Sequence, residues 1–387
     1  MHVARIRIRP SIGRRLSARV VFLTVLAHCP SFVHGQVAGA VPLHLVELAR
    51  ISGEDHDLSA IGRIAVSPDG RIWISQPQDG NIRSFSPAGR PLNVVGRRGE
   101  GPGEFAPPTS LHDDGRALLV LDSRQRRVVK FNREGRHLST DRLPTVAELP
   151  PSATPLLAAP GVIVYRATRR LDSDSEPDST IYLIADAAGR SVVQMAALPR
   201  ENCSLDDPAR TAGIFIPFCA QSYAAVSPSA KYVTIAWPDH GSRSQRGVIL
   251  TLRDHAGGRI HQTTISLGAA RIPVSVRDSV IAGVVERQRA MFPDLVKKLV
   301  SSDLVAKNWP PITQVSVSDE GTTWFVTPQG EAGTEVVCAV SRTGALVGCA
   351  TLPDRALTIG WSGEDQIAII QETEDGLHDL VLYRLST

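Results

Sequence analysis

The amino-acid sequence predicts an all-β fold, a six-bladed β-propeller built from four-stranded antiparallel blades. Three observations lead to this prediction: a repeated strand pattern, glycine-bearing turns at a regular spacing, and an incomplete last repeat together with an unassigned strand near the N-terminus. Self-similarity at a spacing of roughly 40 to 50 residues is typical of propellers, in which each repeat is one blade.

The first 35 residues have the pattern of a secretory signal peptide. They contain six arginines and no acidic residue, then an apolar run at residues 20–26, then small residues before Gly35. This run is far shorter than the roughly 20 residues of a membrane-spanning helix, which argues against a membrane anchor. We expect cleavage after Gly35, or at residues 38–40 as an alternative, so that residues 36–387 form one propeller domain that is secreted or periplasmic.

Charge and cysteine content limit the classes of function. The formal net charge of +3 includes the six N-terminal arginines, and without them 36 basic residues stand against 39 acidic residues, a net charge of −3. The basic composition is therefore no evidence for nucleic-acid binding. Four cysteines would remain after cleavage, and an even number in an oxidising compartment favours disulfides over metal ligation.

The repeats are defined by short apolar strands between glycine turns. In the first copy the turn glycines are Gly70 and Gly89, and in the second they are Gly115 and Gly135, shifted by 45 and 46 residues. Agreement at two turn positions argues against chance similarity, and glycine supplies the positive φ angles that tight hairpins need. The five complete copies lie at about residues 64–96, 108–144, 156–199, 223–268 and 312–353.

The last repeat, residues 356–387, contains only three predicted strands. A blade that lacks its outer strand would expose a sheet edge, which native proteins avoid. Residues 43–51 form an unassigned strand ahead of the first blade. We therefore predict that residues 43–51 complete the sixth blade and close the ring.

One segment, at about residues 271–310, breaks the strand pattern. Its apolar residues recur at helical spacing on both sides of Pro293, which lies where a second helix would begin. The sequence predicts a helical pair inserted between blades four and five. Two roles are open, a cap packed on the ring or a lid over the channel mouth.

The four remaining cysteines are predicted to form two disulfides. A two-residue hairpin loop at residues 343–344 sets a register in which Cys338 lies directly opposite Cys349, close enough for a bridge. Cys203 and Cys219 lie 16 residues apart in the connection between blades three and four. Free or cross-paired thiols are the alternative.

The string Gly-Glu-Gly-Pro-Gly-Glu-Phe at residues 99–105 resembles the inter-blade linker of NHL-type six-bladed propellers and of secreted bacterial six-bladed propellers. The resemblance implies a sharp turn set by glycine and proline and anchored by a packed phenylalanine. A phosphate-binding loop should open a helix, whereas this string leads into a strand, so its role is structural. The linker residues are Gly101, Pro102, Gly103, Glu104 and Phe105.

Some families that resemble this chain are enzymes, either calcium-dependent lactonases with channel carboxylates and amides or amidating lyases with zinc-binding histidines. The predicted inner strands contain no Asp or Glu, and their single histidine is His112. Neither a calcium site nor a zinc site can be assembled from them, so we predict no metal, cofactor or catalytic residue there. These strands are residues 61–67, 108–112, 155–159, 221–227, 312–318 and 356–361.

Polar residues on the predicted inner strands would form a neutral or weakly cationic ligand pocket, or else solvate a water-filled channel. The candidates for ligand contact are Arg63, His112, Gln221, Tyr223, Gln314 and Trp361, with Thr109 and Thr313 beside them.

Two charged segments are assigned general roles. The carboxylates of Asp172, Asp174, Glu176 and Asp178 alternate as in a calcium loop but lack its glycine, so a solvated loop is expected and calcium binding is the alternative. The basic stretch at residues 124–136 has no aromatic platform, which favours a solvated blade edge over a nucleic-acid track.

The sequence therefore favours a monomeric, secreted or periplasmic binding module, not an enzyme, whose partner is a protein, peptide or glycan held by loops at one channel face. The alternative is a hydrolase or lyase with an active site on its loops. A third interpretation is a component of a cell-envelope assembly.

Overall fold

The structure is a computed structural model of the 387-residue chain. It describes residues 37, 39–145, 148–169, 179–199, 201, 203–206, 213–239, 246–268, 270–301, 303–330, 332–362 and 365–386.

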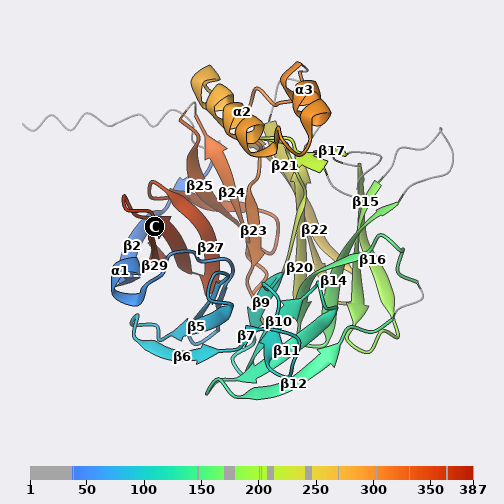
Figure 1. The fold of residues 1–387 in the computed structure, drawn as a ribbon, viewed down its shortest axis with the longest axis vertical. Helices are drawn as coiled ribbons and strands as arrows, with labels where there is room; N and C mark the ends of the chain where they lie inside the picture. The colour runs from blue at the N-terminus through green and yellow to red at the C-terminus, as the bar shows by residue number, and fades with distance from the viewer. Residues whose placement is uncertain are drawn as a thin grey trace, which may run out of the picture. The chain divides into compact units, whose positions relative to one another are not determined.

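In the described residues, six sheets of four or five strands, each with four consecutive antiparallel strands, are arranged in a ring, which confirms the six-bladed prediction (Figure 1). Blade one consists of β3 (Ile64–Val66), β4 (Ile72–Gln76), β5 (Asn81–Phe85) and β6 (Pro91–Val95), and blade two of β9 (Ser110–Asp113), β10 (Ala117–Asp122), β11 (Arg127–Asn132) and β12 (His137–Arg142). Blade three consists of β13 (Thr154–Ala159), β14 (Val162–Arg169), β15 (Ser179–Asp186) and β16 (Val192–Pro199), and blade four of β19 (Tyr223–Val226), β20 (Tyr232–Pro238), β21 (Arg246–Asp254) and β22 (Arg259–Leu267). Blade five consists of β23 (Gln314–Val317), β24 (Thr323–Gln329), β25 (Thr334–Val340) and β26 (Leu346–Thr351), and blade six of β27 (Ala356–Ser362), β28 (Gln366–Glu372), β29 (His378–Ser386) and an N-terminal strand.

The ring closes through this N-terminal strand, β2 (His44–Ile51), as predicted. It pairs antiparallel with β29, from His44 opposite Ser386 to Ile51 opposite Leu380. Ile51 is 1% exposed and packs in the core between blades six and one. The short helix α1 (Gly53–His56) then leads into blade one. Blade six therefore joins the two ends of the propeller in one sheet.

A fifth strand on blade five was not predicted. β1 (Val41–Pro42) pairs parallel with β26, outside the four expected strands. Just before it, Val37 is 2% exposed and belongs to the core between blades four and five. A two-residue strand has no measurable sequence period, so sequence reasoning could not have found it.

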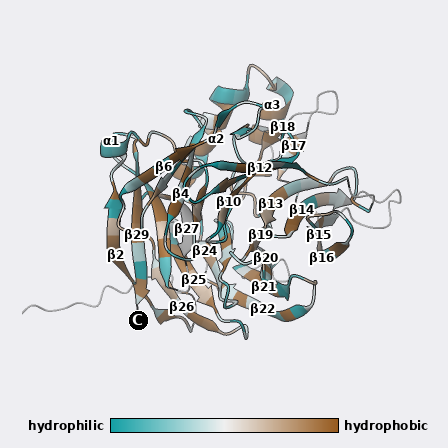
Figure 2. Ribbon diagram, turned by 90° about the horizontal axis from the view of Figure 1, so that it is seen from below, coloured by the Kyte–Doolittle hydropathy of each residue, from teal (hydrophilic) through white to brown (hydrophobic). Residues whose placement is uncertain are grey.

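The core lies between neighbouring blades, because most strands are apolar on both faces. Figure 2 shows hydrophobic residues along many of the strands and hydrophilic residues in α1. Trp73 is fully buried between blades one and two, and its indole Nε1 donates to Asp113 Oδ2 at 2.5 Å. This bond joins two blades at a point where both groups are out of solvent.

The linker after blade one is held by close packing and by one arginine. Its ends form a parallel pair, β7 (Arg97–Arg98) and β8 (Glu104–Phe105). Phe105 is 1% exposed and lies so close to Gly96, whose φ is +68°, that a Cβ there would be 2.1 Å from the ring. The buried Arg127 guanidinium donates to the carbonyl oxygens of three linker residues, Gly99, Glu100 and Glu104.

Arg246 has the same place in blade four that Arg127 has in blade two, the first residue of the third strand. Its guanidinium donates to the carbonyl oxygens of Gly268 and Pro310, both at 3.0 Å, and of Pro328 at 2.9 Å. Burial lowers its pKa to about 10. Gly268 and Pro310 flank the inserted helices, so Arg246 fastens both ends of the insertion to blade five.

The insertion contains two helices, α2 (Val274–Gln288) and α3 (Pro293–Ser301), and α3 begins at Pro293 as predicted. The two ends of the insertion meet in a narrow neck, where Trp309 N donates to Ala270 O at 2.8 Å and Ile272 N donates to Lys307 O at 2.9 Å. The helices pack against a hairpin that was not predicted, β17 (Ser204–Asp206) and β18 (Gly213–Phe215), with Ile214 among the shared buried residues.

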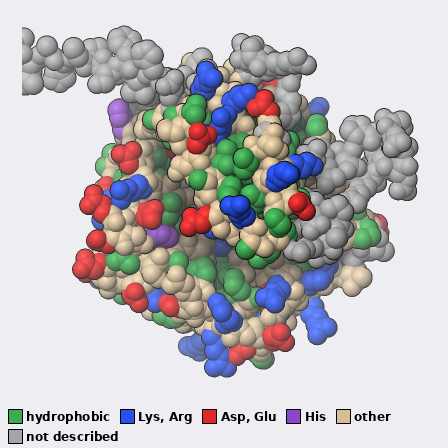
Figure 3. Space-filling view, turned by 45° about the horizontal axis from the view of Figure 1, so that its top comes forward, with side chains coloured by type: hydrophobic (Ala, Val, Ile, Leu, Met, Phe, Trp, Pro, Cys, Tyr) green, Lys and Arg blue, Asp and Glu red, His purple; other side chains and the backbone are tan. Residues whose placement is uncertain are grey.

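The outer surface of the insertion carries exposed apolar side chains. Figure 3, in which the top of Figure 1 comes forward, shows hydrophobic side chains gathered among Lys, Arg, Asp and Glu. The large exposed apolar residues of the insertion are Val274, Val276, Val280, Met291, Val300 and Leu304. No helix in the described part of the chain is long and apolar enough to span a membrane.

Both predicted cysteine pairs are bonded, with Cα–Cα distances of 5.4 Å for Cys203–Cys219 and 4.1 Å for Cys338–Cys349. The predicted two-residue loop at residues 343–344 is wrong. Ser341 N donates to Ala345 O, so the loop has three residues, and a bulge in the hairpin restores the pairing of Cys338 with Cys349. Three-residue hairpin loops with a glycine in the left-handed region characteristically carry such a bulge, and Gly344 has φ +87°.

Candidate functional site at the channel mouth

A cavity of about 590 Å³ follows the channel and is lined mainly by the first strands of the blades. Because every blade starts at the channel, these first strands run in one direction, and their first residues meet at one end. We call this end the entry mouth and define it by Arg63, Thr109, Tyr223 and Thr313. The far mouth lies at the other end, where the first strands finish near Pro228.

Four of the predicted ligand-contact residues line the cavity: Arg63, His112, Tyr223 and Gln314. Thr109 and Thr313 line it as well. Gln221 is not among the described lining residues. Trp361 belongs to β27, and its side chain lies outside the described part of the structure.

His112 crosses the channel near the far mouth. Its Nε2 lies 2.6 Å from Pro228 O, which joins blade two to blade four. A carbonyl oxygen only accepts, so Nε2 carries the proton in this contact. Burial lowers the pKa of His112, which keeps the imidazole neutral. The ring is thus engaged with the protein and narrows the channel.

One sequence-based boundary needs correction. β9 ends at Asp113 and not at residue 112, so the first strands do contain an acidic residue. Asp113 accepts from Trp73 and from Gly115 N, at 2.7 Å, and burial raises its pKa. Nearby, Asp319 accepts from Ser229 N at 2.8 Å and from its hydroxyl at 2.6 Å. These acids at the far mouth hold the blades together.

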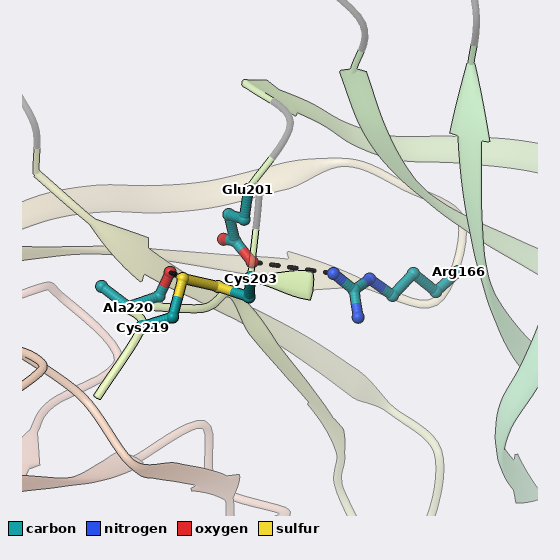
Figure 4. Close-up of a disulfide and its surroundings, with 5 residues drawn as sticks. All are labelled: Arg166, Glu201, Cys203, Cys219 and Ala220. Atoms are coloured by element: carbon teal, nitrogen blue, oxygen red, sulfur yellow. Dashed lines mark hydrogen bonds and ion pairs between the residues drawn. A yellow bond between two sulfur atoms is a disulfide. The ribbon is translucent and has the colours of Figure 1, made fainter. Parts of the chain in front are cut away.

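Beside the entry mouth, blades three and four enclose a polar cluster next to the Cys203–Cys219 disulfide (Figure 4). Glu201 has a side chain only 6% exposed, and its Oε2 lies 3.6 Å from Arg166 Nη2, beyond hydrogen-bonding distance. Tyr182 shares a buried hydrogen bond of 2.9 Å with the Ser222 hydroxyl. Burial raises the pKa of Glu201, against the opposing effects of hydrogen bonds from Ser222 and the charge of Arg166.

A second carboxyl group, Glu335 on β25, approaches the same mouth from blade five. Its Oε1 accepts from the Thr313 hydroxyl at 3.2 Å, and Thr313 lines the cavity. Burial raises the pKa of Glu335, and no described residue supplies a cation to it. Burial is the main cause that raises the pKa of Tyr223. The negative charge of Glu201 is the next cause, and that of Glu335 has a smaller effect in the same direction. Tyr223 therefore lies within electrostatic reach of both carboxyl groups.

Sequence reasoning missed these carboxyl groups because it examined only the first strands. Glu201 comes from the connection after blade three, and Glu335 from the start of a third strand. A single acid at the edge of the apolar run at residues 334–340 was the available signal for Glu335. For Glu201, the only sequence signal was its position two residues before Cys203.

Arg63 lies across the mouth from these groups. The blades follow one another around the ring, which places blade one opposite blade four. Arg63 lies four residues before Ser67, and Tyr223 lies four residues before Ser227. These two serines follow the first strands of blades one and four, so Arg63 and Tyr223 occupy equivalent positions in their blades. The Arg63 side chain is exposed and has no hydrogen-bond or ion-pair partner among the described residues. The entry mouth therefore has a guanidinium on one side, and on the other side two carboxyl groups lie behind the lining residues Tyr223 and Thr313.

The described residues contain no group of three or more His, Cys, Asp and Glu side chains that could hold a metal. Residues 172–178, the predicted acidic loop, lie outside the described residues. In the basic stretch, Arg127 holds the linker, Lys130 pairs with Asp141 at 2.8 Å, and Arg133 pairs with Asp69. No described residue of the insertion between 270 and 310 lines the cavity, which favours its interpretation as a cap.

Comparison with known proteins supports the architecture. Residues 52–195 match a family model described as a 6-bladed beta-propeller, a stretch that reaches from α1 into β16. The chain is a six-bladed β-propeller. No curated protein matches it.

Solved structures similar to this chain are distant in sequence. A member of the DUF4221 family from Bacteroides vulgatus has 8% identity and a TM-score of 0.50, over 89% of this chain and 98% of that chain. A Bacteroides fragilis protein classed as exported has 14% identity and a TM-score of 0.45, over 89% and 96% of the two chains. A gluconolactonase from Xanthomonas campestris has 14% identity and a TM-score of 0.41, over 91% and 100%. At these identities the likeness concerns the fold alone.

Proposed function

We propose that the protein is a binding module that holds a polar ligand at the entry mouth of its channel. The observation that carries this proposal is the cavity of about 590 Å³, whose entry mouth combines polar side chains from several blades. Small-ligand sites have volumes of about 300 to 1,000 Å³ and place a few polar groups on a largely apolar wall. Arg63 lines the cavity and its side chain lacks a charged partner among the described residues, so a ligand would complete its contacts.

Secretion or export to the periplasm is part of the proposal. It is supported by the signal-peptide pattern of the first 35 residues and by two disulfides, which persist mainly in oxidising compartments. The finer relationship to NHL-type propellers also belongs to the proposal, and it rests on the string at residues 99–105. The partner class remains a protein, peptide or glycan.

A hydrolase or lyase is the second candidate, and one observation favours it. Burial raises the pKa values of Glu201 and Glu335, and carboxyl groups of this kind serve as general acids in many enzymes. Raised pKa values also occur in purely structural clusters. Binding is therefore the first candidate.

The test is a thermal-shift and calorimetric screen of the purified protein with oligoalanines, neutral oligosaccharides and dicarboxylic acids. We expect one class to bind the wild type and to bind Tyr223→Ala and Arg63→Ala more weakly. Leu138→Ala is the matched control, because Leu138 is 56% exposed on the outer strand of blade two. Absence of binding by every class, or binding that both mouth variants leave unchanged, would overturn the proposal. Turnover of lactone, ester or peptide-amide substrates that is lost in Glu335→Gln would support the enzyme instead.

A further inference from the structure

The charges at the entry mouth are separated across the channel. On blade one, Arg63 presents a guanidinium at the cavity wall without a partner among the described residues. On the opposite side, Tyr223 of blade four and Thr313 of blade five line the cavity, with Glu335 bonded to Thr313. The mouth therefore has a positive charge on the side of blade one and a carboxyl group behind the side of blades four and five.

The carboxyl group without a nearby cation among the described residues is Glu335, which does not itself line the cavity but is bonded to Thr313, which does. Glu201 already has Arg166 at 3.6 Å and hydrogen bonds from Ser222, and its side chain is 6% exposed. Glu335 has only the neutral Thr313 hydroxyl among described partners. A half-buried carboxylate without a nearby cation is unfavourable, so a positively charged group bound on its side of the mouth would be stabilised.

We propose that the entry mouth binds a zwitterion, a short peptide with free ends, whose ammonium group lies by Tyr223 and Thr313, on the side of Glu335, and whose carboxylate lies by Arg63. This inference rests on the proposed binding function and names its ligand class.

The chemistry of each end fits this assignment. A guanidinium binds a carboxylate through two parallel hydrogen bonds, which fixes the orientation of the ligand. An ammonium group forms charge-assisted hydrogen bonds with a carboxylate and is attracted to the face of a tyrosine ring. Deeper along the first strands, the cavity wall includes small and aliphatic residues such as Ala65, Leu111 and Ala225.

Other ligand classes fit less well. A dicarboxylate would bring a second negative charge towards Glu335, and a neutral sugar would leave both charged groups without a charged partner. The contact between His112 and Pro228 narrows the far mouth, so a ligand that enters at Arg63 has a limited depth. Because the two ends of the ligand lie on opposite sides of the same mouth, a short peptide, in which each residue adds about 3.5 Å, can be matched to the width of the mouth.

The test uses calorimetry of the purified protein with alanine oligomers of two to four residues, together with their N-acetylated and C-amidated forms. We expect one length to bind best, because both ends must reach their partners. Blocking either end should weaken binding by about 10- to 100-fold, the usual effect of losing one charge-assisted contact. Glu335→Gln should bind the free and N-acetylated peptides equally, and Arg63→Ala should bind the free and C-amidated peptides equally.

Two further outcomes decide the inference. If peptides bind but blocking both ends leaves the affinity unchanged, the zwitterion assignment is wrong while binding at the mouth stands. If oligosaccharides bind and peptides do not, the assignment is wrong in the same way. Glu335→Gln keeps the size of the side chain and its acceptor for Thr313, and Leu138→Ala, far from the mouth, should bind every peptide as the wild type does.

Discussion

Removal of the Cys203–Cys219 disulfide by a double alanine substitution is expected to destabilise the protein by about 3 kcal/mol at 25 °C. The two cysteines are 16 residues apart, and the chain-entropy treatment of a closed loop of that length gives this magnitude. Alanine avoids leaving a buried hydroxyl group without a partner. The bridge also lies at the base of the hairpin on which α3 packs, so the insertion should lose protection first.

The measurement is urea unfolding of the oxidised wild type and the variant, with hydrogen exchange resolved over α2 and α3. The matched control is the double alanine variant of Cys338 and Cys349, which are 11 residues apart, for which the same treatment gives about 2.8 kcal/mol. The control should lose similar stability without selective exposure of the helices. A loss below about 1 kcal/mol at Cys203–Cys219, with the full loss in the control, would refute the reasoning.

Two more predictions concern ring closure and pH. A chain that begins at residue 52 lacks β2 and leaves β29 as an open edge, so we expect a much lower melting temperature. Val46→Ala, at an exposed position of β2, is the control and should change the melting temperature little. An unchanged melting temperature in the truncated chain would contradict closure by β2. Burial lowers the pKa of His112 in the folded state, so the fold favours the neutral imidazole. The stability that this preference contributes is fully present above the unfolded-state pKa of about 6.5 and is lost as the pH falls through the folded-state pKa. Urea midpoints at pH 7.5 and pH 5 should therefore differ more in the wild type than in His112→Gln, and equal differences would count against this role.

Most of the fold could be predicted because each blade repeats the same physical requirements. Gly70 and Gly115 occupy the same turn in successive blades with φ angles of +81° and +83°, and glycine adopts such angles without steric cost. The incomplete last repeat required a strand from elsewhere, and residues 43–51 were the segment available. The helical insertion could be predicted because the apolar residues around Pro293 recur with a period of about 3.6 residues, which differs clearly from the period of about 2 in strands.

The candidate site was only partly predictable. Arg63 and Tyr223 were found because they lie directly before or at the start of first strands, whose place at the channel follows from the fold. Glu201 and Glu335 approach the mouth from a connection and from a third strand, and their proximity to Tyr223 depends on how blades three, four and five pack. Sequence spacing within one blade carries no information about contacts between blades. The hairpin of β17 and β18 was missed because three-residue strands show no period.

The neck of the helical insertion makes this segment a position at which chain can be inserted or replaced without changing the ring. Backbone bonds join its two ends, and Arg246 binds the carbonyl oxygens on either side, so the path of the ring between blades four and five is already closed without the helices. A foreign domain grafted there, or new chain termini opened between α2 and α3, would leave the blades in place. The insertion is therefore expected to accept changes of length and sequence that the blades would not accept.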